Sequence, residues 1–546
     1  MNHAIEHPAS APQRLDTAAT RAVDDPATHG PLARRIAGHA LLLGIAGDTL
    51  LRDLPVGAAF PLWIALLVLA AIAAAWSDGR RISREMAAWL AAAVLFSCGL
   101  MWRDSSTLHF LDFLATMGAL GMAAIASADA RSALLAARFR DTVWATASLA
   151  RTVAAGFVPI ALRELFTPER RQRSTSRLAP ILRAAIIVAL LVVVFGSLLR
   201  EADPIFASLV RLPELDVALF LSHAAVIGFY AWMVSGWARG ALVVDLGRKR
   251  APDTVPFGLG MLDITMTLAT LNVLFASFVV AQLGWFFGGE SFLRARTGLT
   301  ASAYARQGFF EMLWVVLLVI PLLVATRAAL RPGRDLERRH TALSLPVIAL
   351  LGAIILSAAM RMRLYVHYYG LTTDRLYPLI FMGWLGVVLA WLSLTVLRGR
   401  GRPFIAGVAL SGLAVLAALN VAAPDAFVAR FNMQRAAHAA RDAETVLDLT
   451  NLAELSAEAA EIATEATLAS PRGAVGTNVR TNYDAQRCDA ARTLLDRWGP
   501  LSQAAARRHV NGSWRFWSAG QARAVRVVGA RSAALRTVTH LACKHR

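Results

Sequence analysis

Residues 343–359, LSLPVIALLGAIILSAA, form an apolar stretch, and a polar, aromatic stretch follows it at 361–377, RMRLYVHYYGLTTDRLY. The first carries no charged residue, which is typical of a helix that crosses the ~30 Å hydrocarbon layer of a bilayer. The second holds three arginines, one histidine, one aspartate and four tyrosines. The apolar stretch therefore indicates the fold class, and the polar stretch is a candidate for either an interfacial anchor or a functional site.

The whole chain repeats this apolar pattern. Its 546 residues are 56% hydrophobic, with a mean hydropathy of +0.50, which is more than the surface of a soluble protein tolerates. About eleven runs, within a range of about 10–12, are long enough to span a bilayer and predict an all-α, polytopic transmembrane helix bundle. The predicted spans are 36–51, 54–76, 86–101, 108–127, 179–199, 216–238, 257–287, 309–329, 343–359, 376–397 and 404–422.

Five regions are expected along the chain. They are a disordered cytoplasmic tail (1–35), a four-span membrane region (36–127), a basic cytoplasmic loop (128–178), a seven-span membrane domain (179–423) and a soluble, mostly helical C-terminal region (424–546). Within the basic loop, 142–162 is long enough to span, but Arg151 at its centre costs ~3 kcal/mol on insertion scales. An amphipathic helix on the cytoplasmic surface is the preferred interpretation.

Basic residues give the predicted topology. The net charge is +19 and comes from arginine, since only Lys249 and Lys544 are lysines. Basic clusters fall in every second loop, as expected of loops that face the cytoplasm, so the N-terminus is predicted inside and the C-terminal region outside. The segment 36–51 is assigned as a span and 142–162 is not. If exactly one of these two assignments is wrong, the C-terminal region lies on the other side. Arginine also suits anionic membrane lipids, and no RNA- or DNA-binding signature is present, so nucleic acid is not an expected partner.

The common catalytic signatures are missing from the sequence. It has no Walker A loop, HExxH, GxSxG or CxxC, so it points to no enzyme activity and to no metal or other cofactor. Several polar residues inside the predicted spans are nonetheless costly in lipid. They are Asp48, Asp112, His223, Asp263, Asn272 and Gln282. Asp263 shares a helix face with Thr267 and Thr270, which predicts a polar seam between helices, with a proton or ion pathway as the alternative.

The expected redox state of two of the three cysteines depends on the predicted topology. Cys98 lies in an apolar span and is expected to be a small buried side chain. Cys488 and Cys543 both lie in the C-terminal region. If that region is outside, an oxidising compartment permits a disulfide between them, and if it is inside, two reduced thiols are expected.

Four polar stretches lie on the outer side in this topology. They end the spans at 179–199 and 343–359, precede the span at 309–329, and follow the span at 404–422. We predict that they build an outward-facing polar vestibule. Its candidate residues are Asp203, Tyr304, Arg306, Glu311, Arg361, Arg363, Tyr365, His367, Asp374 and Arg430. Arginine pairs there would hold phosphate or carboxylate, and the alternative is a belt of tyrosines and arginines at headgroup depth.

Six stretches together carry a resemblance to a known family. They are ADPIF (202–206), NVLFASFVVAQLGWFFGG (272–289), YARQGFFE (304–311), RMRLYVHYYGLTTDRLY (361–377), NVAAPDAFVARFN (420–432) and WRFWSAGQARA (514–524). In this order they resemble the landmarks of a multipass family of the bacterial inner membrane that is described only as a domain of unknown function. The resemblance covers roughly 179–524 and implies no reaction, cofactor or catalytic residue.

Three functions are compatible with these patterns. The first is the binding or transport of an anionic or lipid-linked envelope component at the vestibule. The second is a membrane-embedded lipid or envelope transferase with Glu311, Asp374 or His367 as the general base. The third is a membrane scaffold or sensor that meets envelope partners through its C-terminal region.

Overall fold

The computed structural model describes eleven stretches of the chain and a few isolated helical positions between 184 and 199. The stretches are 26–53, 57–126, 139–158, 216–244, 260–297, 309–330, 333–399, 403–439, 447–469, 477–502 and 513–543. These parts are helices joined by turns, without a β-strand, as the sequence predicts. The chain divides into two compact units, which are described one at a time.

The first unit comprises Met1–Arg52, Leu69–Arg81 and Ala150–Val244. Its main contact is between α2 (Pro26–Leu51) and α11 (Val217–Leu242). Leu32 and Ala33 of α2 are fully buried, so the tail that the sequence predicts to be disordered to residue 35 is helical from Pro26 onward. The burial of these apolar side chains explains the difference, because it stabilises a helix of otherwise ordinary composition.

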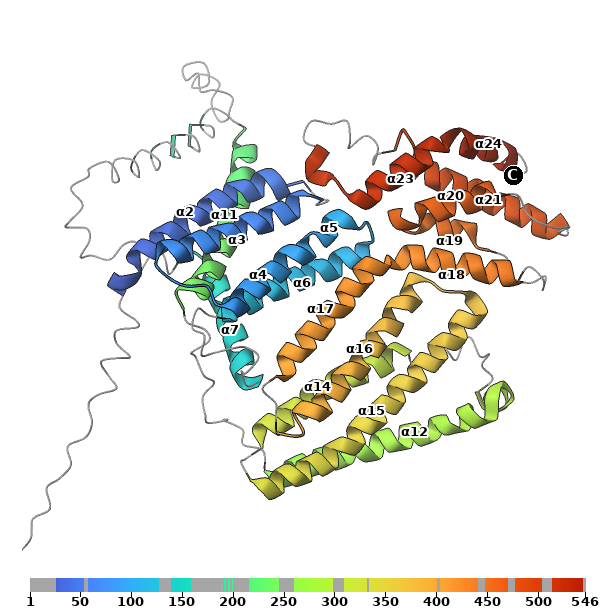
Figure 1. The fold of residues 1–546 in the computed structure, drawn as a ribbon, viewed down its shortest axis with the longest axis horizontal. Coiled ribbons are helices and arrows are strands. Elements are labelled where there is room, and N and C mark those ends of the chain that lie inside the picture. Colours follow the sequence, from blue (N-terminus) through green and yellow to red (C-terminus); the bar gives the residue numbers. More distant parts are fainter. Residues whose placement is uncertain are drawn as a thin grey trace, which may run out of the picture. The chain divides into compact units, whose positions relative to one another are not determined.

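The second unit comprises Asp53–Val68, Ile82–Leu149 and Asp245–Arg546. Its N-terminal helices are α4 (Arg84–Ser97), α5 (Gly99–Trp102) and α6 (Ser106–Ile125). The middle helices are α12 (Met261–Thr297), α14 (Phe309–Ala329), α15 (Arg334–Tyr369), α16 (Thr373–Thr395) and α17 (Phe404–Ala422). Figure 1 shows α12, α15, α16, α17 and α6 following one another side by side, which agrees with the contacts between these helices.

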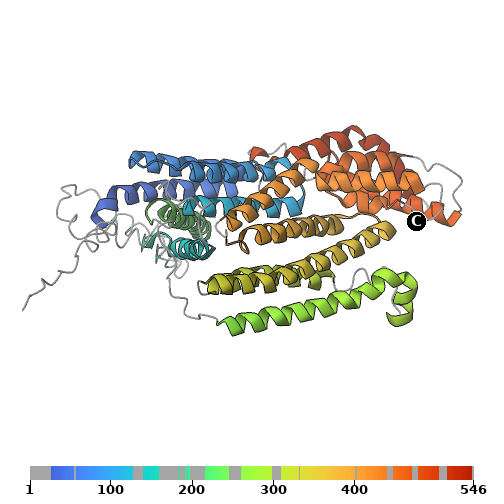
Figure 2. The same cartoon turned by 60° about the horizontal axis from the view of Figure 1, so that its bottom comes forward.

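The C-terminal helices belong to this same unit instead of forming a separate one. They are α18 (Pro424–Ala439), α19 (Leu449–Glu454), η3 (Ala457–Ala459), α20 (Ala460–Leu468), α21 (Thr477–Trp498), η4 (Ser513–Phe516), α23 (Ala519–Ala530) and α24 (Ser532–Ala542). Their shared core contains Cys488, Leu494 and Val528, and Leu371 from the α15–α16 turn also enters it. Figure 2 shows these helices beside that turn.

Nine helices among the described residues are long and apolar enough to cross a membrane. They are Ala59–Ser77, Arg84–Trp102, Ser106–Ile125, Ala218–Leu242, Met261–Gln282, Glu311–Ala329, Asp335–His367, Thr373–Thr395 and Phe404–Ala422. Of the eleven predicted spans, 179–199 lies largely outside the described residues. The other difference is α2, whose charged residues Arg34, Arg35 and Asp48 make it less apolar than a span.

Two further helices complete the described fold. Helix α3 (Ala59–Ser77) is the first of the nine candidate spans, and α7 (Phe139–Ala155) is not among them. Helix α7 overlaps the segment 142–162, for which the sequence predicts an amphipathic helix. It buries Thr142, Ala145 and Leu149 on one face and exposes Arg151.

Candidate functional site

A three-residue loop between α5 and α6, Arg103–Ser105, is the centre of the most extensive polar network in the described residues. Arg103 donates from Nε to the carbonyl oxygen of Asn420 at 2.7 Å and from Nη2 to that of Val421 at 3.3 Å. These are carbonyls of the last turn of α17, which has no further helical N–H groups to bind them. Burial lowers the pKa of the Arg103 guanidinium, and the nearby Glu458 carboxylate opposes that shift.

Asp104 connects the same loop to the C-terminal helices. Its carboxylate accepts from the backbone N–H of Ala457 at 3.1 Å and from Nε2 of Gln521 at 2.8 Å. Its own backbone N–H donates to Oε1 of Glu458 at 2.8 Å. A Cβ at position 520 would lie 2.8 Å from the same Glu458 oxygen, so glycine lets α23 approach this closely. The loop, η3 and α23 are therefore joined by charge-assisted hydrogen bonds.

Asp425 adds a buried carboxyl at the start of α18. It is 6% exposed, and its Oδ1 accepts from the backbone N–H of Ser456 at 3.3 Å. The Ser456 hydroxyl donates to Oε2 of Glu458 at 2.5 Å, which brings a second acid close. Burial raises the pKa of Asp425, the Glu458 charge adds to this rise, and the Ser456 hydrogen bonds oppose it. We call Arg103, Asp104, Asp425, Ser456, Glu458 and Gln521 the polar junction.

Two residues extend the polar junction toward α16. The hydroxyl oxygens of Ser105 and Tyr377 lie 3.3 Å apart, and Ser518 Oγ donates to the carbonyl of Arg103 at 3.3 Å. Tyr377 belongs to the stretch at 361–377, and Ser518 belongs to the stretch at 514–524. The loop is thus joined to segments distant in the sequence, with separations from 272 residues for Ser105 and Tyr377 to 417 for Asp104 and Gln521.

The costly residues of the spans mostly pair between helices. Asn420 on α17 donates from Nδ2 to Oδ1 of Asp112 on α6 at 2.8 Å. In the first unit, His223 Nδ1 on α11 lies 2.5 Å from Asp48 Oδ2 on α2. Each such pair gives a polar side chain at least one partner on a second helix, which supports an interhelix role for these residues.

The other two pairs of this kind start from α12. Asn272 donates to the carbonyl of Leu343 on α15 at 2.9 Å, and the Ser357 hydroxyl of α15 donates to Oε1 of Gln282. Asp263, Thr267 and Thr270 differ, because all three are exposed in the structure. Asp263 accepts from the backbone N–H of Gly260 at 2.9 Å, and the Thr267 hydroxyl donates to the carbonyl of Asp263. These contacts are local to the first turns of α12 and bring no second helix to the predicted seam.

The α15–α16 turn, within the stretch at 361–377, is fixed mainly by contacts to its backbone and by stacking. Asn432 on α18 accepts from the N–H of Leu371 at 3.0 Å and donates to its carbonyl at 2.7 Å. The Arg375 guanidinium lies over the Tyr365 ring at 4.2 Å. Gly370 has φ 78°, which favours glycine. This stretch is therefore a packed corner against α18.

The predicted vestibule residues are distributed over this corner and beyond it. Arg361 is 6% exposed, and Tyr365 is half-buried. The exposed members are Glu311, Arg363, His367, Asp374 and Arg430. Asp203, Tyr304 and Arg306 lie outside the described residues. Within the described part, no hydrogen bond or ion pair joins Glu311 to the members on α15 and α16.

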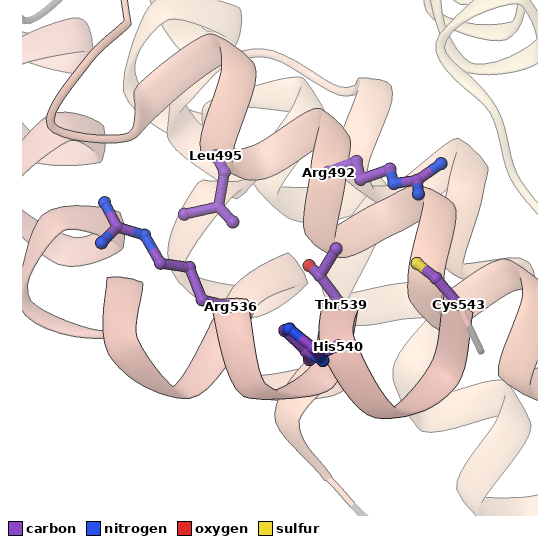
Figure 3. A pocket seen from close by; sticks show the side chains of 6 residues that line it. All are labelled: Arg492, Leu495, Arg536, Thr539, His540 and Cys543. Atoms are coloured by element: carbon purple, nitrogen blue, oxygen red, sulfur yellow. The ribbon is translucent and has the colours of Figure 1, made fainter.

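The C-terminal helices carry a disulfide and a hollow next to it. Cys488 on α21 and Cys543 after α24 are bonded, with their Cα atoms 5.4 Å apart. A hollow of about 480 Å³ is lined by Arg492, Leu495, Arg536, Thr539, His540 and Cys543. Figure 3 shows the guanidinium groups of Arg492 and Arg536 at opposite sides of this hollow, with His540 between them. Its lining holds cationic groups and no acid.

Sequence reasoning did not single out Arg103, Asp104 or Glu458. The only available signal was a charged pair in a very short connection between two apolar helices, at 103–104. A connection of that length has little freedom, so its charged side chains must find partners close by. Asn420 and Asp425 lie in a quoted stretch, but nothing in the sequence indicates which residues they contact.

The nine apolar helices and the helical C-terminal region define a multipass α-helical membrane protein. The chain belongs to the family described as Domain of unknown function (DUF4153), whose model matches residues 90–466. This match begins earlier and ends earlier than the expected 179–524, so it includes the Arg103–Ser105 loop and excludes α21–α24. No curated protein and no solved structure matches the chain.

Proposed function

We propose that this protein binds an anionic or lipid-linked envelope component on the outer side of the bacterial inner membrane. The observation that carries the proposal is the hollow between α21 and α24, lined by Arg492, Arg536 and His540. Arginine binds carboxylate and phosphate through paired hydrogen bonds, which suits an anionic group. The proposal moves the binding site from the vestibule predicted at the four polar stretches to the C-terminal helices.

The position of the two arginines favours an elongated ligand. Their guanidinium groups flank the hollow instead of converging on one point, as seen in Figure 3. A chain with several negative groups could meet both sides of the hollow at once. Residues 471–546 carry fourteen basic residues against three acids, which would also attract such a chain.

The placement of basic residues supports an outer location for this hollow. The C-terminal helices contact the α5–α6 loop, the α15–α16 turn and the α17–α18 corner. Basic residues occur at the other ends of the same helices, at Arg84, Arg334 and Arg398. Cytoplasmic loops are the ones enriched in basic residues, which favours the opposite, outer side for the C-terminal helices.

Binding to defined anions tests the proposal directly. The probes are fluorescently labelled polyphosphate and, as competitor, inorganic phosphate, added to the full-length protein in detergent micelles. Arg492→Ala with Arg536→Ala is expected to weaken polyphosphate binding about tenfold, equivalent to about 1.4 kcal/mol. Arg526→Ala with Arg531→Ala is the matched control, since it removes the same charge outside the hollow. Equal losses in both double variants, or no binding by the wild type, would refute the site.

The disulfide gives an independent test of location. In cells treated with a membrane-permeant alkylating reagent before lysis, an outer C-terminal region is expected to leave only Cys98 alkylated. Mass spectrometry of the purified protein counts the modified thiols. Alkylation of Cys488 and Cys543 as well would place these helices in the cytoplasm and would contradict the outer location.

A scaffold or sensor is the second candidate function, and the polar junction favours it. Charge-assisted hydrogen bonds from Asp104 connect the α5–α6 loop of the membrane helices to η3 and α23. A ligand on the C-terminal helices could thereby change the conformation of the membrane helices. In the wild type, this role predicts that a bound anion protects the α5–α6 loop from proteolysis. In Asp104→Asn, the anion should still bind but should no longer protect the loop. If Asp104→Asn loses both anion binding and the protection of the loop, the result would argue against the scaffold or sensor role.

A further inference from the structure

Asp112 and Asn420 form a polar pair between two candidate membrane spans, α6 and α17. Asp112 is 0% exposed and Asn420 is 5% exposed. Asn420 Nδ2 donates to Asp112 Oδ1 at 2.8 Å and also to the carbonyl of Leu416 at 3.2 Å. Both hydrogens of the Asn420 amide are therefore used, and the orientation of that amide is fixed by its own helix.

With an ionised Asp112, the pair has one hydrogen-bond donor too few for its acceptor oxygens. Asp112 Oδ2 and Asn420 Oδ1 are both buried, and neither has a hydrogen-bond partner among the described residues. Leaving two buried acceptor oxygens unpaired is costly, and an ionised carboxylate without a cation is more costly still. One proton on Asp112 would remove the charge and supply a donor.

The surroundings contain no cation that would replace this proton. The helices packed on α6 include α4, α5 and α17, and α3, which has no titratable residue, contacts α6 through the Phe60 and Phe113 rings. Near the pair, the titratable groups of these elements are Cys98 and Arg103, and α17 has none. Tyr377 of α16 and His109 of α6 complete the set. Asp112 takes part in no ion pair of the described residues, and Arg103 is directed to the carbonyls that end α17.

The space around the carboxyl also limits what can bind. A Cβ at Gly99 would lie 2.0 Å from Asp112 Oδ2, so that oxygen packs directly on the Gly99 backbone. This contact takes up one side of the carboxyl, where a hydrated cation would need its water ligands. A proton needs no such room.

We propose that Asp112 is a proton-binding site in which the protonated carboxyl and the Asn420 amide form a neutral hydrogen-bonded pair. Asn420 Nδ2 donates to one carboxyl oxygen, and the hydroxyl of the other donates to Asn420 Oδ1. The site is separate from the anion-binding hollow and does not rest on that proposal. It places a neutral acid between two membrane helices, with Asn420 also bound to Arg103 of the polar junction. Release of the proton would leave a buried charge and loosen the contact between α6 and α17.

Infrared spectroscopy of the purified full-length protein at neutral pH tests the site. The wild type is expected to show the carbonyl stretch of a protonated carboxyl, and the band is expected to disappear in Asp112→Asn. The matched control is Asp374→Asn, an exposed aspartate whose replacement should leave the band unchanged. A spectrum in which Asp112→Asn instead removes a carboxylate band would overturn the proposal.

Stability gives a second readout that does not depend on the band. Asparagine is neutral and donates hydrogen bonds as a protonated aspartate does, so Asp112→Asn should fold and keep its melting temperature. The wild type is expected to lose stability at alkaline pH, where the proton leaves, and the variant is not. If Asp112→Asn fails to fold while Asp374→Asn folds, the native group is an anion and the proposal is wrong. Gly99→Ala should destabilise both the wild type and Asp112→Asn, because the added Cβ meets the side chain at position 112.

Discussion

The α5–α6 loop and the α15–α16 turn are both polar connections between apolar helices, but they are built differently. The loop has three residues, and each is bound to an element distant in sequence. The turn follows a stretch rich in arginine and tyrosine, yet Arg363, His367 and Asp374 remain exposed. The stretch with many charged residues, at the α15–α16 turn, is therefore the more exposed of the two. The buried polar network is formed at the short α5–α6 loop. The size of mutational effects in the two regions tests this difference.

Removing the Asp104 carboxylate is expected to have the largest effect. Asp104→Ala leaves the Ala457 N–H and the Gln521 amide without their acceptor and should lower the free energy of unfolding by about 3 kcal/mol. The matched change in the turn, Asp374→Ala, should cost less than about 0.5 kcal/mol because that side chain is exposed. Chemical unfolding in detergent micelles measures both. Similar losses would show that the two regions do not differ in the proposed way.

Replacing Gly370 tests whether the turn depends on its backbone instead of its charges. Gly370→Ala forces an L-residue into φ 78° and places a Cβ 2.9 Å from Arg435 Nη1. The expected loss is about 2 kcal/mol in the free energy of unfolding. Gly383→Ala is the control, because no atom lies within 4 Å of its Cβ, and it should leave stability unchanged or raise it. A turn that tolerates alanine at 370 would contradict this account.

Arg375 is the arginine of the turn with the clearest packing role. Its guanidinium lies 4.2 Å from the centre of the Tyr365 ring and also donates to the Gly370 carbonyl. Arg375→Ala should lower the free energy of unfolding by about 1 kcal/mol. Arg363→Ala, at an exposed position of α15, is expected to have almost no effect in the same unfolding experiment. A larger loss at Arg363 would point to a role for the exposed arginines in the fold.

The same comparison shows what could be predicted from the sequence. The helical membrane class follows from apolar runs such as 343–359, because hydropathy is a local property. The positions of the turn at Gly370 and of the start of α16 at Thr373, just after Thr372, follow from local backbone preferences as well. Contacts such as Asp104 with Ala457 join residues 353 positions apart, and no local pattern encodes which partner is chosen. The hollow between α21 and α24, the proposed anion-binding site, is hidden from sequence reasoning for the same reason, since these helices meet only in the folded chain.

Asp425 is expected to show the smallest net effect and a distinctive pH dependence. Its pKa is raised by burial in the folded protein, so the folded state holds a proton over a range where the unfolded state has lost it. Stability then falls as pH rises from about 4, the ordinary value of an aspartate, through the raised folded pKa. Asp425→Asn keeps an oxygen for the Ser456 N–H and carries no charge. The variant should match the wild type near pH 4, within about 0.5 kcal/mol, and be the more stable of the two at neutral pH.

Thermal melting of both proteins across this pH range measures that difference, and Asp374→Asn serves as the exposed control. A wild type that gains stability relative to Asp425→Asn as the pH rises would mean that the carboxylate is favoured in the folded protein. In that case the polar junction would be stabilised by a charge at Asp425, and Arg103 is the member of the junction that carries a positive charge to balance it. The direction of this pH dependence therefore decides whether the buried acids of the junction are held neutral or ionised, which neither their spacing in the sequence nor their burial alone determines.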